Sequence, residues 1–509
     1  MRLLTVKIKN FRSYKEQVEI SVGNLTTLVG KNDIGKSSIL EALDIFFNKG
    51  KGSIKMDKDD VNKSCLADDH KVTEITVTFD QFPESIVIDS TNETSLNAEY
   101  LLNESGHLEI IKRYNNGGGE KVFIKANHPT NTNCSDLLLK TQSALQKIIS
   151  EGEIECENMT RNAVMRASIW SHYVDNLGLE EIEIDVTKGE TKSIWDKLEN
   201  YLPLYSLFQS DRKNSDGDNE IQDPLNEAVK QIMSNGEIQE TLASVAEIVE
   251  RKLQEVAGLT LDKLREMNPE IADSLNPVIP SSESLKWNDV FKKVSITGDE
   301  DIPINKRGSG VKRLILLNFF RAEAERRRRE RNVPSVIYAI EEPETSQHTA
   351  HQKMLVRALI ELSESNNTQI LLTTHSPVIV KEMTFAHLRL ILLEDGCKTV
   401  NSVLPGQLPY PSLNEVNFTA FEEITEEYHN ELYGFLESEG QIDDFKNGKD
   451  KKEYIRLRRD GSTLIEQKVL TEYIRHQIHH PENTNNLRFT EIQLRESIEL
   501  MRAYIDNQS

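Results

Sequence analysis

The first stretch whose residues could do chemistry is GKNDIGKS, which runs from Gly30 to Ser37. Its glycines let backbone amides curl around a phosphate, Lys36 supplies a charge for the β- and γ-phosphates, and the Ser37 hydroxyl can ligate Mg²⁺. The apolar run LTTLV precedes it and a helical pattern follows, which is the setting that this motif requires. The pattern predicts a nucleotide site in preference to a plain glycine turn. We also expect nucleotide contacts from Asn32, Gly35 and Ser38.

The stretch VIYAIEEPETSQH, Val336 to His348, begins as an apolar strand and ends in carboxylates. Paired acids are costly to desolvate, so a metal ion, a water to be activated or simple solvent exposure must compensate them. Beside a phosphate loop, the acid that ends such a strand helps to hold Mg²⁺, and a following Glu can orient the attacking water. We therefore expect Glu341 near the metal and Glu342 near the water. Two solvent-exposed acids are the alternative.

Two further stretches place polar residues where an anion could bind. QILLTTHSP is an apolar strand that ends near His375, which could hydrogen-bond the γ-phosphate or the attacking water, although an ordinary strand-end histidine is the alternative. KRGSGVKRLILLNFF opens an apolar helix with Gly308, Ser309 and Gly310, whose backbone amides suit an anion. A simple helix N-cap at Ser309 would explain the same pattern.

The elements that must position these residues predict an α/β protein with more than one unit. A chain of 509 residues exceeds the size at which single hydrophobic cores stop growing. Strand patterns dominate 1–128, long helical periodicity predicts a helical insertion over 129–283, and strands alternate with helices over 284–411. That alternation is typical of a mainly parallel sheet. Residues 412–509 predict an all-helical module, whose acidic part is followed by a basic part over 446–459.

The composition limits the partners and the compartment. A net charge of −22 excludes a surface that binds nucleic acid everywhere, so DNA or RNA would need a local basic groove. Four cysteines without CxxC spacing indicate neither a zinc site nor a disulfide framework. No stretch has the length of a membrane span and none resembles a signal peptide, so we expect no membrane association and a cytoplasmic location.

The order of these motifs resembles the ABC-type ATPases of the SMC, RecF and OLD group. The resemblance covers residues 1 to about 80 and 285 to 400, and IKNFRSYKE is similar to the opening strand and turn of that group. It implies an α/β fold with an ABC-type P-loop ATPase head, and ATP and Mg²⁺ as cofactors. It also implies the following roles: Arg12 near the nucleotide, Lys36 and Ser37 on phosphate and Mg²⁺, Glu341 supporting the metal, Glu342 as the catalytic carboxylate and His375 as the γ-phosphate sensor. Gln209 is a weaker candidate for a Mg²⁺ ligand, with an exposed loop position as the alternative.

The same resemblance implies an assembly and a partner. Gly308, Ser309 and Gly310 match the signature segment that caps the ATP of the opposite subunit, so we expect a homodimer or a higher homo-oligomer with ATP between its heads. Two departures bear on hydrolysis: Glu341 stands where Asp is commoner, and Gly308 stands where Ser is expected. With neither a long coiled coil nor a clear metal-nuclease domain, the chain looks like the stand-alone anti-phage defence ATPases of the Septu PtuA type, which work with a separate nuclease effector.

A second short motif lies near the C-terminus, in LTEYIRHQIHHPENTNN. Arg475 and His480 resemble the R-x4-6-H motif of the HEPN helical domains, many of which are metal-independent ribonucleases. A guanidinium could hold the scissile phosphate while an imidazole moves a proton, whereas a partner-binding module is the alternative. Three functions stay open: an ATPase that senses infection and controls a nuclease, a self-contained ribonuclease toxin, and a RecF-like DNA-repair ATPase.

Overall fold

The computed structural model describes residues 1–49, 52–88, 93–187, 191–209, 335–345, 347–458 and 460–508, with isolated positions between 240 and 258 and at 329. The chain divides into one unit of residues 1–210 and 324–509 and a second of residues 211–323. The predicted signature segment, Gly308 to Gly310, lies outside the described residues, as does the predicted insertion after residue 209 apart from the isolated positions.

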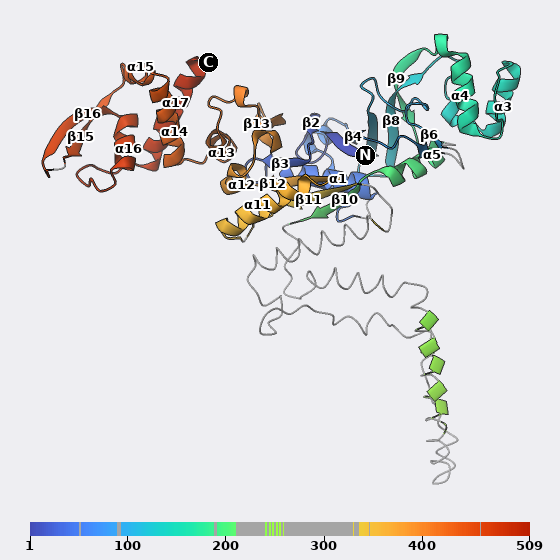
Figure 1. The fold of residues 1–509 in the computed structure, drawn as a ribbon, viewed down its shortest axis with the longest axis horizontal. Coiled ribbons are helices and arrows are strands. Elements are labelled where there is room, and N and C mark those ends of the chain that lie inside the picture. The colour runs from blue at the N-terminus through green and yellow to red at the C-terminus, as the bar shows by residue number, and fades with distance from the viewer. Residues whose placement is uncertain are drawn as a thin grey trace, which may run out of the picture. The chain divides into compact units, whose positions relative to one another are not determined.

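A six-stranded, mainly parallel sheet forms the centre of the first unit (Figure 1). In spatial order its strands are β10 (Leu204–Phe208), β11 (Val336–Glu341), β12 (Thr368–Thr374), β3 (Leu25–Val29), β13 (Leu388–Glu394) and β14 (Cys397–Ser402). All neighbours pair in parallel except β13 and β14. Every residue of β3 and β12 is buried, as expected for strands covered on both faces. The strand and helix alternation after residue 335 therefore predicted the sheet type correctly.

Helices follow the strands that end at the site. α1 (Lys36–Asn48) starts directly after the loop that follows β3, where the sequence shows a helical pattern. It buries an apolar face, and its Leu40 carbonyl accepts a hydrogen bond of 2.6 Å from the Tyr205 hydroxyl of β10. α11 (Thr349–Ser363) follows β11, and the short α12 (Pro377–Lys381) follows β12.

A second, antiparallel sheet accounts for the strand-rich N-terminal segment. In spatial order its strands are β2 (Val18–Ser21), β1 (Arg2–Lys9), β4 (Val72–Asp80), β7 (Leu108–Asn115), β8 (Glu120–Pro129) and β9 (Leu179–Asp185). Smaller elements beside it are α2 (Lys63–Ala67), β5 (Ile86–Val87) and β6 (Glu93–Thr94). Buried apolar residues of β1, β4, β7 and β8 continue into one core with α1.

The prediction of a helical insertion over 129–283 is wrong for its first part. Only α3 (Gln142–Glu151), α4 (Asn162–His172) and α5 (Thr191–Leu198) are α-helices in the described residues between 129 and 209. In the same stretch β9 pairs with β8 and β10 pairs with β11, so both belong to the sheets. β9 is an exposed edge strand with the sequence LEEIEID, and its acidic residues hide the alternation that marks a half-buried strand.

The C-terminal module is mainly helical but also contains a β-hairpin that the sequence analysis did not predict. Its helices are α13 (Leu413–Phe421), α14 (Glu426–Ser438), α15 (Ile442–Lys446), α16 (Leu470–His479) and α17 (Glu491–Gln508). The hairpin joins β15 (Lys451–Leu457) to β16 (Thr463–Val469), and β15 lies within residues 446–459, which the sequence marked as basic. A core of its own, with Leu432, Phe445 and Ile498 fully buried, holds the helices together.

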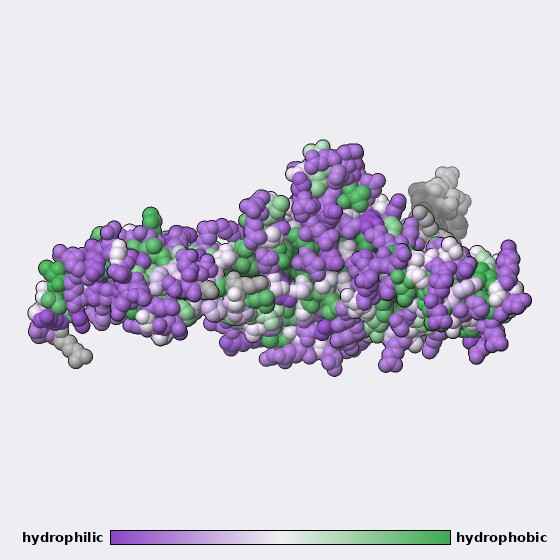
Figure 2. All heavy atoms as spheres, turned by 90° about the horizontal axis from the view of Figure 1, so that it is seen from above, coloured by the Kyte–Doolittle hydropathy of each residue, from purple (hydrophilic) through white to green (hydrophobic). Residues whose placement is uncertain are grey.

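Hydrophilic residues cover most of the face drawn in Figure 2, and hydrophobic ones are scattered among them. This agrees with the charged fraction of 28% in the sequence. Among the helices that the structure describes, none combines the length and the apolar character needed to cross a bilayer.

Candidate functional site

The loop between β3 and α1 has a shape that requires glycine at position 35. Gly35 has φ 107°, a left-handed conformation, and a Cβ there would lie 2.9 Å from Ser13 Oγ and 3.0 Å from the Tyr14 hydroxyl oxygen. The Tyr14 hydroxyl donates a hydrogen bond of 3.1 Å to the Gly35 carbonyl. Within the fully described α1, no side chain caps the N-terminus and no acid lies in the first turn. The first amides of the helix are therefore free to meet an anion.

Lys36 is the buried cation of this loop, with 4% of its surface exposed. Its ammonium donates hydrogen bonds of 2.8 Å to the carbonyls of Gly30 and Lys31. Burial lowers the pKa of Lys36, and four carboxylates act against that shift. In decreasing order of effect these are Glu342, Glu344, Asp33 and Glu341. The structure thus brings the loop at residue 36 within electrostatic reach of acids some 300 positions further along the chain.

The sheet topology explains why these distant stretches meet. β3 pairs in parallel with β12, and β12 pairs in parallel with β11, so the three strands end at the same edge. The chain passes from β12 on one side of β3 to β13 on the other, which makes this edge a topological switch point. Ligands of open α/β sheets bind at such points, outside the carboxyl ends of the strands.

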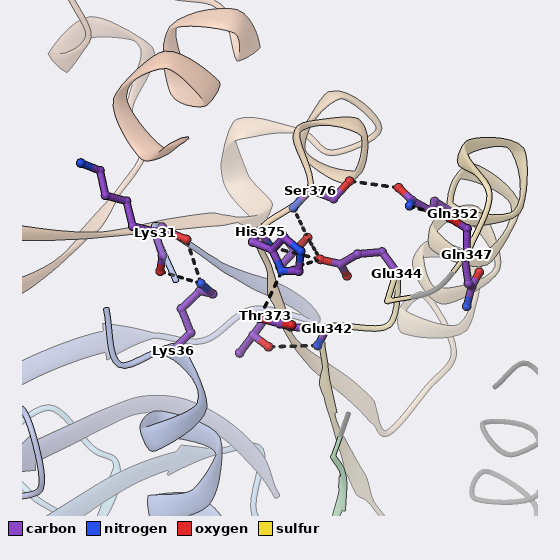
Figure 3. A network of polar contacts seen from close by, with 11 residues as sticks. Lys31, Lys36, Glu342, Glu344, Gln347, Gln352, Thr373, His375 and Ser376 are labelled. Atoms are coloured by element: carbon purple, nitrogen blue, oxygen red, sulfur yellow. Dashed lines mark hydrogen bonds and ion pairs between the residues drawn. The ribbon is translucent and has the colours of Figure 1, made fainter. Parts of the chain in front are cut away.

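Glu342 leaves the end of β11 in a strained conformation. Its φ is 40°, which is unusual for a residue with a side chain and costs about 1–3 kcal/mol. The strain is offset by its N–H, which donates to both the carbonyl and the hydroxyl oxygen of Thr373 at 3.1 Å. The Glu342 carboxylate lies 3.2 Å from His375 Nδ1, without hydrogen-bond geometry. The structure therefore places the two predicted catalytic side chains side by side (Figure 3).

A third acid, Glu344, was not predicted as a site residue. It is only 3% exposed, and its Oε1 accepts hydrogen bonds from Thr374 Oγ1 at 2.7 Å and from the His375 N–H at 3.1 Å. Burial raises the pKa of Glu344. The only signal in the sequence was the position of this acid, two residues after the paired glutamates and separated from them by a proline.

The side chains of Arg12 and Gln209 both contact Glu41 of α1. The Arg12 guanidinium pairs with Glu41 and lies 2.8 Å from Asp60 Oδ1, while Gln209 Nε2 donates to Glu41 Oε1 at 3.1 Å. Glu41 lies on the same helix as Lys36, so both residues sit at the helix that carries the phosphate loop. Among the other predicted contacts, Asn32 is exposed, and Ser37 and Ser38 lie half-buried in the first turn of α1.

The C-terminal module contacts the residues that follow the site strands. Lys31 of the phosphate loop forms an ion pair with Glu422, at the end of α13. Asn417 of α13 donates to the carbonyl of Pro377, the first residue of α12, at 3.3 Å. Lys381, at the end of α12, pairs with Glu427 of α14 at 2.6 Å. α13 and α14 therefore pack beside the loop after β3 and the helix after β12.

Arg475 and His480, the predicted ribonuclease pair, face different neighbours. Arg475 pairs with Glu437 of α14 at 3.1 Å and covers the ring of Tyr433. His480 ends α16, contacts Glu482 at 3.1 Å and stacks on His476. His480 is the residue after the last one of α16, and its backbone is no longer helical. A ribonuclease role for the pair stays a prediction.

The residues at the edge of the central sheet fit a magnesium nucleotide. The first amides of α1 have no side-chain cap, so they can donate to phosphate oxygens, and Lys36 supplies a buried positive charge. Among the described residues, no three His, Cys, Asp or Glu side chains are grouped to hold a metal ion by themselves. Ser37 and Glu341 would have to share Mg²⁺ with phosphate oxygens and water, which is how nucleotide sites usually bind it.

Comparisons with known proteins agree with this site. The profile of the AAA ATPase domain family matches residues 1–380. The chain is 23% identical over 409 residues to the Endonuclease GajA of Bacillus cereus, covering 79% of this chain and 60% of that protein. It is 24% identical over 395 residues to the OLD nuclease of Thermus scotoductus, covering 76% and 62%. An ATP/GTP phosphatase of Helicobacter pylori is 21% identical over 403 residues, covering 75% and 90%.

The chain therefore spans about three-fifths of the length of the first two relatives. Among solved structures, the SMC head domain from Thermotoga maritima aligns with 79% of this chain and 100% of its own, at 12% identity and a TM-score of 0.34. The SmcHead bound to the C-winged helix domain of ScpA covers 79% and 97%, at 14% identity and a TM-score of 0.38. The family profile and the strand order confirm the predicted α/β fold with a P-loop ATPase head. Because that profile spans well over half of its length, the chain belongs to the AAA ATPase domain family.

Proposed function

We propose that this chain is a cytoplasmic, Mg²⁺-dependent ABC-type ATPase whose nucleotide-gated homo-oligomer senses infection and controls a separate nuclease effector in bacterial anti-phage defence. The observation that carries the ATPase part is the convergence of buried Lys36 with Glu341 and Glu342 at the ends of β3 and β11. The names of two relatives, an endonuclease and an OLD nuclease, support the link to a nuclease. The defence role and the Septu PtuA type rest on the resemblance in the order of the motifs.

Each residue of the site has a distinct task in this proposal. Bound MgATP would supply the phosphoanhydride bond that is cleaved and a cation that offsets the charge of its phosphates. The loop amides and Lys36 bind the phosphates, and Ser37 with Glu341 holds the metal. Glu342 orients the attacking water and accepts its proton, while His375 lies beside it to contact the terminal phosphate.

The contacts of the C-terminal module support a route for nucleotide gating. Lys31 belongs to the phosphate loop, and Pro377 begins the helix directly after the His375 segment. Both are bound by α13, through Glu422 and Asn417. A shift of either segment on binding or hydrolysis of ATP would therefore act on the module. In this proposal the module carries that change to the nuclease partner.

The test compares Lys36→Ala and Glu342→Gln with the wild-type protein. Without the buried ammonium, ATP binding should weaken at least about tenfold, because a hydrogen bond to a charged group is worth about 1.5–3 kcal/mol. Glu342→Gln should still bind ATP, lose about 10²–10⁴-fold in turnover and accumulate a closed oligomer, because the amide cannot accept the proton of water. Turnover, affinity for a fluorescent ATP analogue and mass by light scattering measure the three effects.

Glu364→Gln is the matched control, since this glutamate is exposed at the end of α11. It should behave as the wild type in all three assays. Equal turnover in the wild type, Lys36→Ala and Glu342→Gln would refute the proposed mechanism. Loss of phage resistance in cells that carry Glu342→Gln, with the expression level unchanged, would connect hydrolysis to the defence role.

A further inference from the structure

The segments that follow β11 and β12 are tied together by buried hydrogen bonds around Glu344. Its Oε1 accepts one bond from the Thr374 hydroxyl at 2.7 Å and one from the His375 backbone N–H at 3.1 Å. The Thr374 oxygen accepts in turn from the Ser376 N–H at 3.0 Å. Three consecutive residues of the turn after β12 are thus held, directly or through one hydroxyl, by a single carboxylate.

A second set of hydrogen bonds also links the segment after β11 to the turn after β12. The Ser376 hydroxyl donates to Gln352 Oε1 at 3.0 Å, and Gln352 Nε2 donates to the Gln347 carbonyl at 3.1 Å. Gln347 Nε2 reaches back to the Pro343 carbonyl at 2.8 Å. We call these contacts and those of Glu344 the strand-end network (Figure 3). It joins the residues after Glu342 to the residues around His375.

Glu344 is the buried carboxylate of this network, and a buried carboxylate is a costly way to fill space. Only 3% of its surface is exposed, and its Oε2 has no hydrogen-bond partner among the described residues. Burying such a group is unfavourable unless hydrogen bonds compensate it, and both bonds that it accepts come from the His375 turn. A methyl group would satisfy packing at lower cost, so what the carboxylate provides is an acceptor oxygen that fixes the position of the turn.

The His375 ring itself has few constraints. Its side chain is 39% exposed, and its Nδ1 lies 3.2 Å from Glu342 and 3.6 Å from Glu344 Oε1. Neither contact has hydrogen-bond geometry at Nδ1. The place of the ring relative to Glu342 therefore depends mainly on the backbone that carries it, and Glu344 holds that backbone.

We propose that Glu344 is a positioning residue, which anchors the turn after β12 so that His375 stays beside Glu342 for ATP hydrolysis. The inference rests on the proposed function, since it concerns the same site. Glu344 acts as a hydrogen-bond acceptor through its Oε1 and touches neither the nucleotide nor the water. Because Gln keeps an oxygen at that position, Glu344→Gln should retain what Glu344→Ala loses.

Kinetics distinguish this role from a structural one. Glu344→Ala should lower kcat about 10²-fold, the effect of a misplacement of about 1 Å, with the KM for ATP changed by less than about twofold. Glu344→Gln should rescue most of that loss, unlike Glu342→Gln. In a His375→Ala background, Glu344→Ala should have no further effect on kcat, because the residue acts through the histidine. The proposal would be overturned if Glu344→Gln lost as much kcat as Glu342→Gln, or if the losses in kcat were additive in the double variant.

Hydrogen exchange of the nucleotide-free protein gives a readout that does not depend on activity. The His375 amide donates to Glu344, so Glu344→Ala should speed its exchange at least about tenfold, whereas Glu344→Gln and the exposed control Glu364→Ala should leave it slow. Thr374→Val removes the hydroxyl that donates to Glu344 and accepts from the Ser376 N–H, and it should give a smaller increase in exchange at His375. It takes the place of Glu344→Ala if that variant fails to fold. Unchanged exchange in Glu344→Ala would refute the anchoring role. A wild-type protein without ATP turnover would instead refute the proposed function, and the exchange result would still decide whether Glu344 holds His375.

Discussion

His429 makes the stability of the C-terminal module depend on pH. It is fully buried on α14, and its Nε2 lies 3.0 Å from the Ser497 oxygen of α17. The Ser497 hydroxyl donates a hydrogen bond of 3.0 Å to the Thr471 hydroxyl of α16. The Ser497 oxygen can therefore accept a hydrogen bond from the N–H of a neutral His429 ring. Burial, with a smaller contribution from the nearby charge of Arg475, lowers the pKa of His429 to about 4. The three helices are therefore joined at a histidine that resists protonation.

The direction and size of the effect follow from the two pKa values, about 6.5 in the unfolded chain and about 4 in the folded one. Well above pH 6.5 neither state binds the proton, and the contribution of His429 to stability is complete. As the pH falls toward 4, the unfolded chain takes up a proton that the folded chain does not, and stability is lost. The loss from pH 7.5 to pH 5 is about 2 kcal/mol, and it reaches about 3 kcal/mol below pH 4.

Hydrogen exchange in α14 measures this loss without requiring the whole chain to unfold in two states. After correction for the intrinsic rate, the opening free energy of the α14 amides in the wild type should fall by about 2 kcal/mol more than in His429→Gln between pH 7.5 and pH 5. Gln can still donate to Ser497 but does not titrate. Equal pH dependence in the two proteins would show that the module is not stabilised by a neutral His429, and the reasoning from burial would be wrong.

Two further substitutions test the phosphate loop and the buried charge of the module. Gly35→Ala should weaken ATP binding at least about tenfold, because the left-handed backbone and the contact with Ser13 both oppose a Cβ. Titration with a fluorescent ATP analogue measures the affinity. Gly440 also has a left-handed backbone but lies in open space, so Gly440→Ala should bind ATP normally. Arg502→Leu should cost about 3–5 kcal/mol in the free energy of unfolding of the module, since it leaves the fully buried Glu415 without its cation. Arg495→Leu, which removes only exposed ion pairs, should cost about 0–1 kcal/mol in the same denaturation experiment.

Much of the site was predictable because its parts are local patterns. The phosphate loop needs glycines at fixed spacing between a strand and a helix, and GKNDIGKS follows LTTLV and precedes α1 as expected. The strands before Glu341 and His375 are apolar runs, since the sheet is covered on both faces. Such signals depend on neighbours within a few residues, so a single sequence can reveal them.

Other features depend on contacts between distant positions and gave weak signals or none. Edge strand β9 is polar because it is mostly exposed. β15 lies in the basic stretch, and no local sequence pattern predicts that it pairs with β16. Arg475 and His480 match a spacing, but their side chains contact different neighbours. A spacing along the chain is not a distance in space, which only the packing of the helices decides.

The chain by itself determined that a phosphate loop and paired acids at the end of a buried strand exist, because glycine freedom, charge and apolar runs act over short distances. Tertiary structure decided that they share one edge of a sheet, since the parallel pairing of β3, β12 and β11 joins segments more than 300 residues apart. It also decided that Glu344 turns inward to hold the His375 segment while its neighbour Glu342 stays at the surface of the site. Identical side chains two positions apart acquire different roles because one is buried among donors and the other is not.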